Sequence, residues 1–507
     1  MRIASRAVVV AWISAITGTL ATLTPLVVAA QTADGAATTT IEQQVADQDQ
    51  RIKILERKLE LASETAAAAA ASSSVVKAGP GGFSLQSADG KNVIKLRGTL
   101  NVDGRYFVDG ITPTTADAFL LRKIRPYIEG TLNGIYDFRL QPELGSGKSV
   151  ILDAYVAARF KPWFVVTAGK FKNPIGLERL QTDAYNKFVE LGFPSSLVPN
   201  RDIGVQLSGT ALNGVINYAL AYTDGVIDGN GTENSPTADT DTDGKHESAA
   251  REFVLPFANT NNFYLRGLGI GLAGSLGSKA GAATLTSVGT VNGVTTTVVT
   301  AATSSWLPTY RTSAQQSFFS YRGDTASTTA VNEATFADGI HSRIAPQAYY
   351  YYGSLGIIGE YVATKQAVTR HVNATTDCSA SLKNSAWQAA VSYFLTGEEA
   401  QYNNVTPLSN FTMGKPDTGA WEIAVRYQQL SVDDAAFAAG ANSFSDPTKS
   451  PSAAKGYSVA LNWYLNQNVR WILEYDQTKF TGGAGTATNL IDRKDEKGFL
   501  TRFAVGF

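Results

Sequence analysis

The chain has 507 residues, but only 17% of them are charged, against about 25% in soluble domains. The 43 basic and 44 acidic side chains nearly cancel, so the chain lacks the basic character of a nucleic-acid-binding protein. A single cysteine, Cys378, excludes a disulfide framework and a cysteine-based zinc site, and three histidines leave little material for catalysis. Aromatic residues reach 10% at a mean hydropathy near zero, a combination that favours alternating β-strands.

The first thirty residues have the organisation of a secretory signal peptide. Arg2 and Arg6 precede an apolar stretch, and the segment ends in the small residues Ala29 and Ala30. A helical membrane anchor is the alternative interpretation. Beyond residue 30 the sequence contains no window of about 18 apolar residues, so any later membrane-spanning part is expected to be a closed β-barrel.

Residues 31–64 are predicted to form a short periplasmic coiled-coil helix. Charged residues occupy the outer face, and apolar residues recur every seven positions at Val45, Ile52 and Leu59. Because about three heptads is the lower limit for a coiled coil, a lone amphipathic helix is the alternative. Residues 65–82, an alanine run followed by serine, glycine and proline, are predicted to be a linker.

From residue 83 to the end, residues 83–507, apolar and polar side chains alternate as they do in transmembrane β-barrels. Near the C-terminus, for example, Trp471 and Leu473 alternate with Arg470 and Glu474. The candidate strands start near residues 92, 118, 135, 150, 163, 201, 215, 248, 263, 341, 355, 385, 418, 455, 468 and 495. We therefore predict an all-β fold, a sixteen-stranded antiparallel transmembrane β-barrel.

The lengths of the connections support a barrel over a soluble β-sandwich. Most even-numbered strands are followed by tight turns, whereas longer loops follow odd-numbered strands, as in outer-membrane barrels. The long loops include residues 172–200, 225–247, 276–340 and 433–454. Residues 397–417 depart from this rule, because this connection follows an even-numbered strand and is nevertheless long.

Several ordered blocks of the barrel region carry a family resemblance. They include AGKFKNPIGLERL at 168–180 and LVPNRDIGVQL at 197–207, together with residues 130–143, 152–156, 419–422 and 461–464. On these residues the chain resembles the phosphate-selective porin O/P family from about residue 83 to the end.

The resemblance implies a trimeric channel in the outer membrane of a Gram-negative bacterium, surrounded by lipid and lipopolysaccharide. It implies that the third extracellular loop, residues 172–200, folds inward as a constriction, and that small anions, phosphate above all, are taken up passively. No cofactor and no enzymatic activity are expected. Two positions depart from the family: Leu191 stands where the loop often has arginine, and the arginine pair of the second strand is Arg122 and Lys123.

The alternation of apolar and polar residues also predicts which side chains face the lumen. Among these inward-facing residues, basic ones outnumber acidic ones. Rings of arginine and lysine select anions in pores, and the guanidinium fork suits phosphate oxygens. The candidate selectivity residues are Arg97, Arg105, Lys123, Arg125, Arg139, Arg159, Lys170, Lys172, Arg179 and Lys187. The alternative is that these bases only solvate a weakly selective general pore.

Other functions remain open at this point. A non-conducting barrel could tether the envelope or bind partners through its N-terminal helix and long loops, and a hydrolase of barrel fold would depend on His341. Residues 239–244 carry the first positions of a calcium loop, but the twelfth position is Ala250 instead of glutamate. A solvated acidic loop is the alternative there.

Overall fold

The structure is a computed structural model that divides into two units, Met1–Ser72 and Ser73–Phe507. It describes residues 37–79, 81–108, 117–147, 149–229, 241, 243–281, 286–291, 294–299, 305–323, 334–373, 376–438, 440 and 443–507. The predicted signal peptide, residues 1–30, lies outside the described residues. Among the described residues, no helix combines the length and apolar character needed to cross a bilayer.

The first unit contains helix α1 (Ala37–Ser72). Alanine has the strongest helix propensity of all residues, so the helix continues through the alanine run into the segment predicted as a linker. Strand β1 (Val75–Gly79) follows directly. Residues 65–82 thus include the end of α1, all of β1 and the first residue of β2. The apolar residues of the predicted heptads are exposed in the single chain, Leu59 to 74%.

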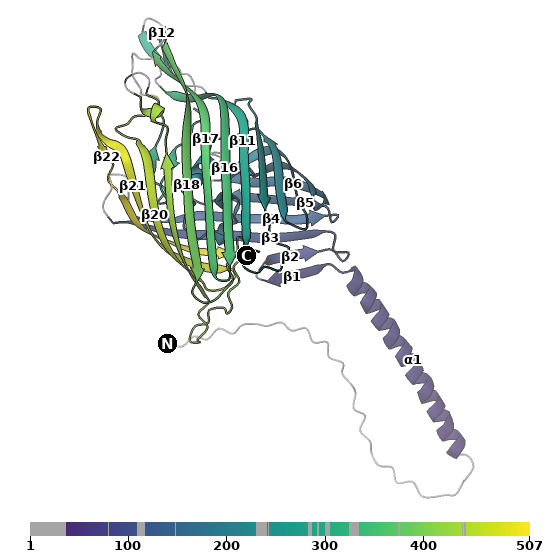
Figure 1. Cartoon of the computed structure of the whole chain (residues 1–507). Helices are drawn as coiled ribbons and strands as arrows, with labels where there is room; N and C mark the ends of the chain where they lie inside the picture. The colour runs from purple at the N-terminus through teal and green to yellow at the C-terminus, as the bar shows by residue number, and fades with distance from the viewer. Residues whose placement is uncertain are drawn as a thin grey trace, which may run out of the picture. The chain divides into compact units, whose positions relative to one another are not determined.

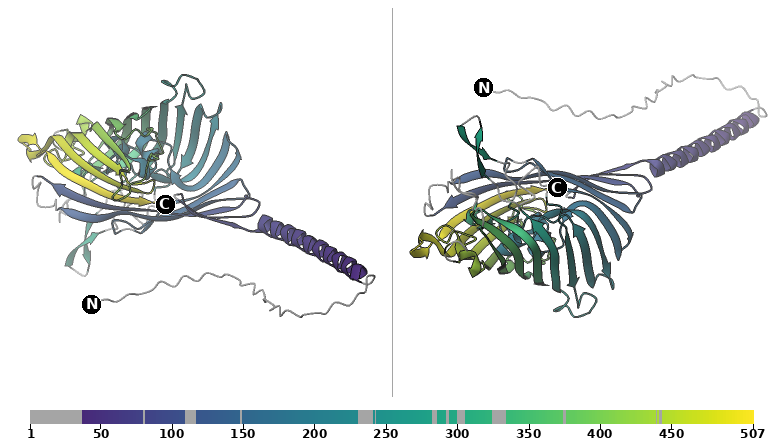
Figure 2. Two further views of the ribbon diagram at one scale, coloured as in Figure 1. Left: turned by 90° about the horizontal axis from the view of Figure 1, so that it is seen from below. Right: turned by 90° about the horizontal axis from the view of Figure 1, so that it is seen from above.

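The second unit is a closed antiparallel barrel (Figures 1 and 2). Within the described residues its sixteen strands are β3 (Val93–Phe107), β4 (Ala118–Leu132), β5 (Tyr136–Glu143), β6 (Val150–Lys161), β7 (Phe164–Lys172), β8 (Arg201–Ala211), β9 (Ile216–Thr223), β10 (Glu247–Val254), β11 (Leu268–Ala280), β16 (Thr335–Tyr352), β17 (Leu355–Asn373), β18 (Thr376–Phe394), β19 (Ala420–Ser431), β20 (Pro451–Tyr464), β21 (Val469–Thr486) and β23 (Glu496–Gly506). The last strand pairs with the first, from Gly498↔Phe107 to Gly506↔Thr99. The predicted sixteen-stranded barrel is confirmed.

Alternation predicted most strand positions well. Four strands start more than two residues from the expected position, namely β11, β16, β18 and β20. Hydrogen bonding to β17 extends β18 back through residues 376–384, which are mostly polar, so that hydropathy carries little signal there. Leu96 and Leu100 are exposed on the outer face of β3, whereas Asp103 and Arg105 are buried on the inner face.

Short strands outside the barrel order pair with one another or extend the ends of barrel strands. Strand β2 (Gly82–Gln86) pairs with β1 and with the start of β3. Strands β12 (Thr286–Val291) and β13 (Val294–Val299) form a hairpin within the long β11–β16 connection. Further along, β14 (Tyr310–Arg311) pairs with β15 (Ser317–Phe319), and β22 (Asn489–Asp492) with the end of β21.

The barrel interior contains chain segments as well as strand side chains. The third loop, residues 173–200, carries helix α2 (Leu177–Leu180) and the 3-10 turns η1 (Asp183–Tyr185) and η2 (Phe193–Leu197). The inner segment, residues 305–323, contains β14 and β15. Leu197 of the third loop and Phe319 of the inner segment belong to one buried apolar cluster. These segments position the candidate site.

Candidate ion-conducting site

Backbone N–H groups of the third loop bind one side of the barrel wall. Leu177 N donates to Glu360 of β17 at 2.6 Å, and Phe193 N donates to Gln428 of β19 at 2.7 Å. These wall side chains satisfy donors that would otherwise be buried without partners. On this side of the barrel the loop is therefore held against β17 and β19.

The tip of the third loop is held by charged side chains of the same wall. Lys187 forms an ion pair with Glu422 at 2.9 Å, and its carbonyl oxygen accepts from Asn462 at 2.9 Å. Val189 N donates to Glu474 at 2.6 Å. Because these groups are almost fully buried, the ammonium group of Lys187 stabilises the loop instead of facing an open passage.

The inner segment fills the lumen beside the third loop, which the sequence did not predict. Arg105 donates to the carbonyl oxygen of Ala314 at 2.9 Å, and Gln428 donates to Ser313 Oγ at 3.1 Å. The rings of Phe193 and Phe318 pack with their centroids 5.9 Å apart.

The turn between β18 and β19, residues 395–419, reaches the third loop from the opposite end of the barrel. Thr182 N donates to Asn403 Oδ1 at 3.1 Å, and Tyr402 donates to the carbonyl oxygen of Leu177 at 2.5 Å. This contact accounts for the unusual length of residues 397–417.

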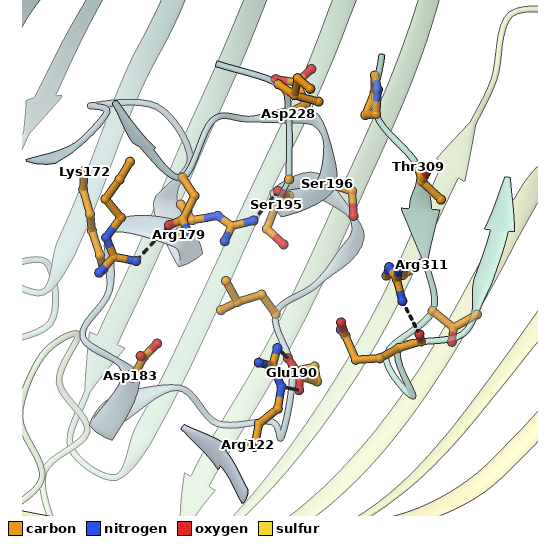
Figure 3. A pocket seen from close by; sticks show the side chains of 18 of the residues that line it. Arg122, Lys172, Arg179, Asp183, Glu190, Ser195, Ser196, Asp228, Thr309 and Arg311 are labelled. Atoms are coloured by element: carbon orange, nitrogen blue, oxygen red, sulfur yellow. Dashed lines mark hydrogen bonds and ion pairs between the residues drawn. The ribbon is translucent and has the colours of Figure 1, made fainter. Parts of the chain in front are cut away.

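Two cavities lie on the side of the third loop that faces β4, β7 and β8. The loop-side cavity, about 260 Å³, is lined by Arg122, Arg179 and Arg311 among others (Figure 3). The turn-side cavity, about 210 Å³, reaches the short turn at Asn466. Lys172, Asp183 and Arg201 line both cavities, so these three side chains mark the place where the two meet.

Basic side chains dominate the lining. Within the described part of the chain, the basic residues around the two cavities are Arg97, Arg122, Lys123, Arg125, Arg139, Lys172, Arg179, Arg201, Arg311 and Arg470. The acidic ones there are Asp183, Glu190 and Asp228. The passage therefore carries a positive potential that attracts anions.

Glu190 lies in a cluster of arginines that joins the third loop to the first strands. Its carboxylate binds Arg122 at 2.6 Å, Arg105 at 2.8 Å and Arg502 at 3.5 Å. Burial alone would raise the pKa of Glu190, but the three guanidinium groups hold that pKa well below its usual range. Glu190 is thus ionised at neutral pH and fastens the loop to the wall.

Asp183 is the acidic group at the junction of the cavities. Its carboxylate lies 3.0 Å from Lys123 Nζ and accepts a hydrogen bond from Arg125 Nη1. Burial would raise the pKa of Asp183, whereas Lys123 and Arg125 hold it well below its ordinary value.

Six of the ten predicted selectivity residues line the cavities. Lys123, Lys172 and Arg179 line the loop-side cavity, and Arg97, Arg125 and Arg139 line the turn-side cavity.

The other four predicted residues line neither cavity. Arg105 and Lys187 are committed to buried ion pairs with Glu190 and Glu422. Lys170 is buried, with 4% of its surface exposed, and Arg159 pairs with Asp137 at 3.1 Å with 47% of its side chain exposed. Alternation correctly directed Arg105 inward, but it could not predict that a loop segment would cover it.

Arg122, Arg201 and Arg311 line the loop-side cavity but were absent from the predicted set. Arg122 is the extra residue of a β-bulge, since Asn101 pairs with Lys123 while Val102 pairs with Leu121. A bulge brings two adjacent side chains to one face, which strict alternation forbids.

The acidic loop retains part of the predicted calcium pattern. Asp241 accepts from the N–H groups of Asp243 and Gly244 at 3.0 Å, while positions 239, 240 and 242 lie outside the described residues. Ligand atoms of Asp224, Asp241 and His246 lie within 4.8 Å of one another. Exposed acidic turns commonly adopt such geometry without an ion.

Residues 94–507 match the family described as phosphate-selective porin O and P. The chain belongs to this family. Porin O of Pseudomonas aeruginosa is 30% identical over 154 residues, which cover 30% of this chain and 33% of that protein. The alignment thus spans about a third of that relative's length.

Membership of a porin family, with the closed barrel, places the chain in the outer membrane of a Gram-negative bacterium and among channels rather than enzymes.

Solved structures of other porins are also similar to the chain. The anion-selective porin from Comamonas acidovorans shares 12% identity, with a TM-score of 0.46 over 82% of this chain and 100% of that one. Salmonella typhi OmpF in complex with daunomycin shares 10% identity, with a TM-score of 0.46 over 85% of this chain and 100% of that one. At these identities and scores neither likeness bears on the solute.

Proposed function

We propose that the chain forms a water-filled channel for the passive uptake of small anions, with phosphate the favoured solute. The observation that carries this proposal is the excess of basic over acidic side chains around the two cavities of the described structure. These bases come from the barrel wall, the third loop and the inner segment, so they surround an ion from several directions. Fixed positive groups at a narrow passage attract anions and raise a barrier to cations.

Phosphate is favoured because most of the lining bases are arginines. A guanidinium group offers parallel N–H donors that match two oxygens of a tetrahedral oxyanion, whereas chloride accepts without such geometry. Arg201, at the junction, is oriented by Asp153 and Asn200, with donor–acceptor distances of 3.1 Å and 2.9 Å. Such orientation supports oxyanion binding at the junction.

A weakly selective general porin is the second candidate function. It is favoured by the acids that already neutralise Arg122, Lys123 and Arg125. The zero-current potential across a planar bilayer in a KCl gradient separates the two candidates. An anion-selective potential, with phosphate blocking the chloride current, supports the proposal. Equal passage of K⁺ and Cl⁻, unaffected by phosphate, contradicts it.

We further propose that the chain is a homotrimer with a periplasmic coiled-coil stalk. The exposed apolar side chains of α1, among them Val45, Ile52 and Leu59, are unsuited to a lone helix in water. Exposed apolar side chains on the outer barrel face, such as Leu96 and Leu473, suit contact with lipid and lipopolysaccharide. Single-channel conductance tests the remaining possibility of a non-conducting envelope tether, which would give no current steps.

A further inference from the structure

Asp183 occupies the position where the two cavities meet, together with Lys172 and Arg201. An anion that crosses from one cavity to the other must therefore pass its carboxylate. Figure 3 shows Asp183 at the edge of the loop-side cavity, below Lys172 and to the left of the Arg122–Glu190 pair. A fixed negative charge at this point opposes the attraction of the surrounding bases.

The contacts of Asp183 are those that an oxyanion would make. One carboxylate oxygen, Oδ2, contacts Lys123 Nζ at 3.0 Å and also accepts from Arg125 Nη1. Both cations belong to β4, whereas Asp183 belongs to the 3-10 turn η1 of the third loop. An acid from the loop therefore lies on two bases of the wall.

The other acids that pair with bases of β4, Glu143 with Arg125 and Glu190 with Arg122, are more deeply buried. Side-chain exposure is 23% for Asp183, but 4% for Glu143 and 6% for Glu190. Glu143 shares Arg125 with Asp183 and also accepts from the backbone N–H groups of Ile124 and Gly145. Glu143 is thus fixed to the wall, while Asp183 borders the open passage.

Because it makes these contacts at the junction, we infer that the Asp183 carboxylate acts as a tethered anion that occupies the binding site of the permeating solute. This inference rests on the proposed anion conduction. A passing oxyanion with two or more charges displaces the carboxylate from Lys123 and Arg125. A halide ion does so poorly, because it is monatomic, carries one charge and has no oxygens to accept two hydrogen bonds side by side. The carboxylate returns after the solute leaves.

The tethered anion also keeps binding weak. Conduction requires a site that attracts the ion yet releases it quickly. Glu143 and Asp153 already pair with Arg125 and Arg201, but without Asp183 the bases of the junction would still hold a polyvalent oxyanion too long. By competing for Lys123 and Arg125, Asp183 shortens the residence of the solute.

The experiment compares purified full-length wild type with Asp183→Asn in planar bilayers, titrating inorganic phosphate against the single-channel chloride current. The inference predicts that the half-blocking phosphate concentration falls at least about tenfold, since a like charge at the site is removed. The current carried by phosphate alone should fall, because release becomes slower. Asp183→Ala is a second charge-removing variant with the same expected result.

Two control variants accompany the measurement. Asp183→Glu keeps the charge, and its half-blocking concentration should stay within about threefold of wild type. Asp137→Asn removes an acid that lines neither cavity and pairs with Arg159 at 3.1 Å, so phosphate block should also stay within about threefold. Heat-modifiable mobility on gels verifies that every variant is folded.

The possible failures are distinguishable. If wild type is anion selective but both charge-removing variants leave the half-blocking concentration unchanged, Asp183 does not compete with the solute and the inference is wrong. A weaker phosphate block in these variants would mean that Asp183 helps to bind the solute, which also overturns the inference. Equal passage of K⁺ and Cl⁻ in wild type would refute the proposed function itself.

Discussion

Arg122 binds Glu190 through two hydrogen bonds, from Nε to Oε1 at 2.6 Å and from Nη2 to Oε2 at 3.1 Å. This forked ion pair joins the bulge of β4 to the third loop across the conducting side of the barrel. The backbone contacts with Glu360 and Gln428 hold the same loop from the opposite wall. The width of the passage therefore depends on contacts at both walls.

Loss of the forked pair should loosen the third loop. We expect Arg122→Gln to raise single-channel conductance in KCl, because the loop can move away from β4. Stability should fall by about 1.5–3 kcal/mol, the range for a hydrogen bond to a charged group. Urea unfolding in detergent and single-channel recording measure the two effects. Arg159→Gln is the matched control, since its exposed ion pair contributes little.

Substitution of Lys172, which precedes the third loop, and of Lys187, which lies within it, should affect different properties of the channel. Lys172→Gln removes a charge shared by both cavities, so the permeability ratio of chloride to potassium should fall roughly two- to fivefold. The zero-current potential in a KCl gradient measures this ratio. An unchanged potential would exclude Lys172 from the filter.

Lys187→Gln should instead leave the permeability ratio unchanged and destabilise the barrel by about 3 kcal/mol, because Glu422 loses its buried partner. Urea unfolding checks the stability, and the zero-current potential checks the selectivity. A shift in that potential without loss of stability would contradict the structural role of Lys187.

The ion pairs of Asp183 and Glu190 should persist under moderate acidification. The pKa values of Asp183 and Glu190 are held below the ordinary carboxyl range by the neighbouring bases, against the effect of burial. The stabilisation from their ion pairs is present above the ordinary carboxyl pKa of about 4 and is lost only as pH falls through the lowered values. Burial raises the pKa of Asp228, which also lines the loop-side cavity, to about 6, so the absolute potential can change in this range. The difference in zero-current potential between wild type and Asp183→Asn should nevertheless be the same at pH 8 and pH 5. A difference that shrinks at pH 5 would show that Asp183 titrates in the ordinary carboxyl range.

Deletion of residues 41–63 should leave single-channel conductance intact, because the barrel closes through β3 and β23 without α1. If the stalk holds subunits together, the deletion will lower the trimer fraction seen by light scattering in detergent. Equal trimer fractions in both proteins would show that the barrel interfaces suffice for assembly.

The strands could be predicted because each has one face in lipid and one in water. That difference imposes a period of two on the sequence, as Leu96 and Leu100 illustrate on the outer face of β3. The junction base Lys172 and the cavity bases Lys123 and Arg125 were found in the same way.

The remainder of the site depends on features without a period. The bulge that directs Arg122 inward depends on pairing between β3 and β4, which a single strand does not reveal. Arg311 reaches the cavity because the inner segment packs against the third loop, for example through Phe318 and Phe193. A loop sequence contains no periodic signal for such a contact.

The contacts that hold the third loop join residues far apart in the chain. Leu177 binds Glu360, 183 positions later, and Val189 binds Glu474, 285 positions later. Such contacts form only after the intervening strands have been brought together. During biogenesis the third loop thus takes its place after most strands of the wall have paired. A barrel halted just before that step would have a wide lumen that admits solutes of any charge. Docking of the loop therefore protects the permeability barrier of the cell.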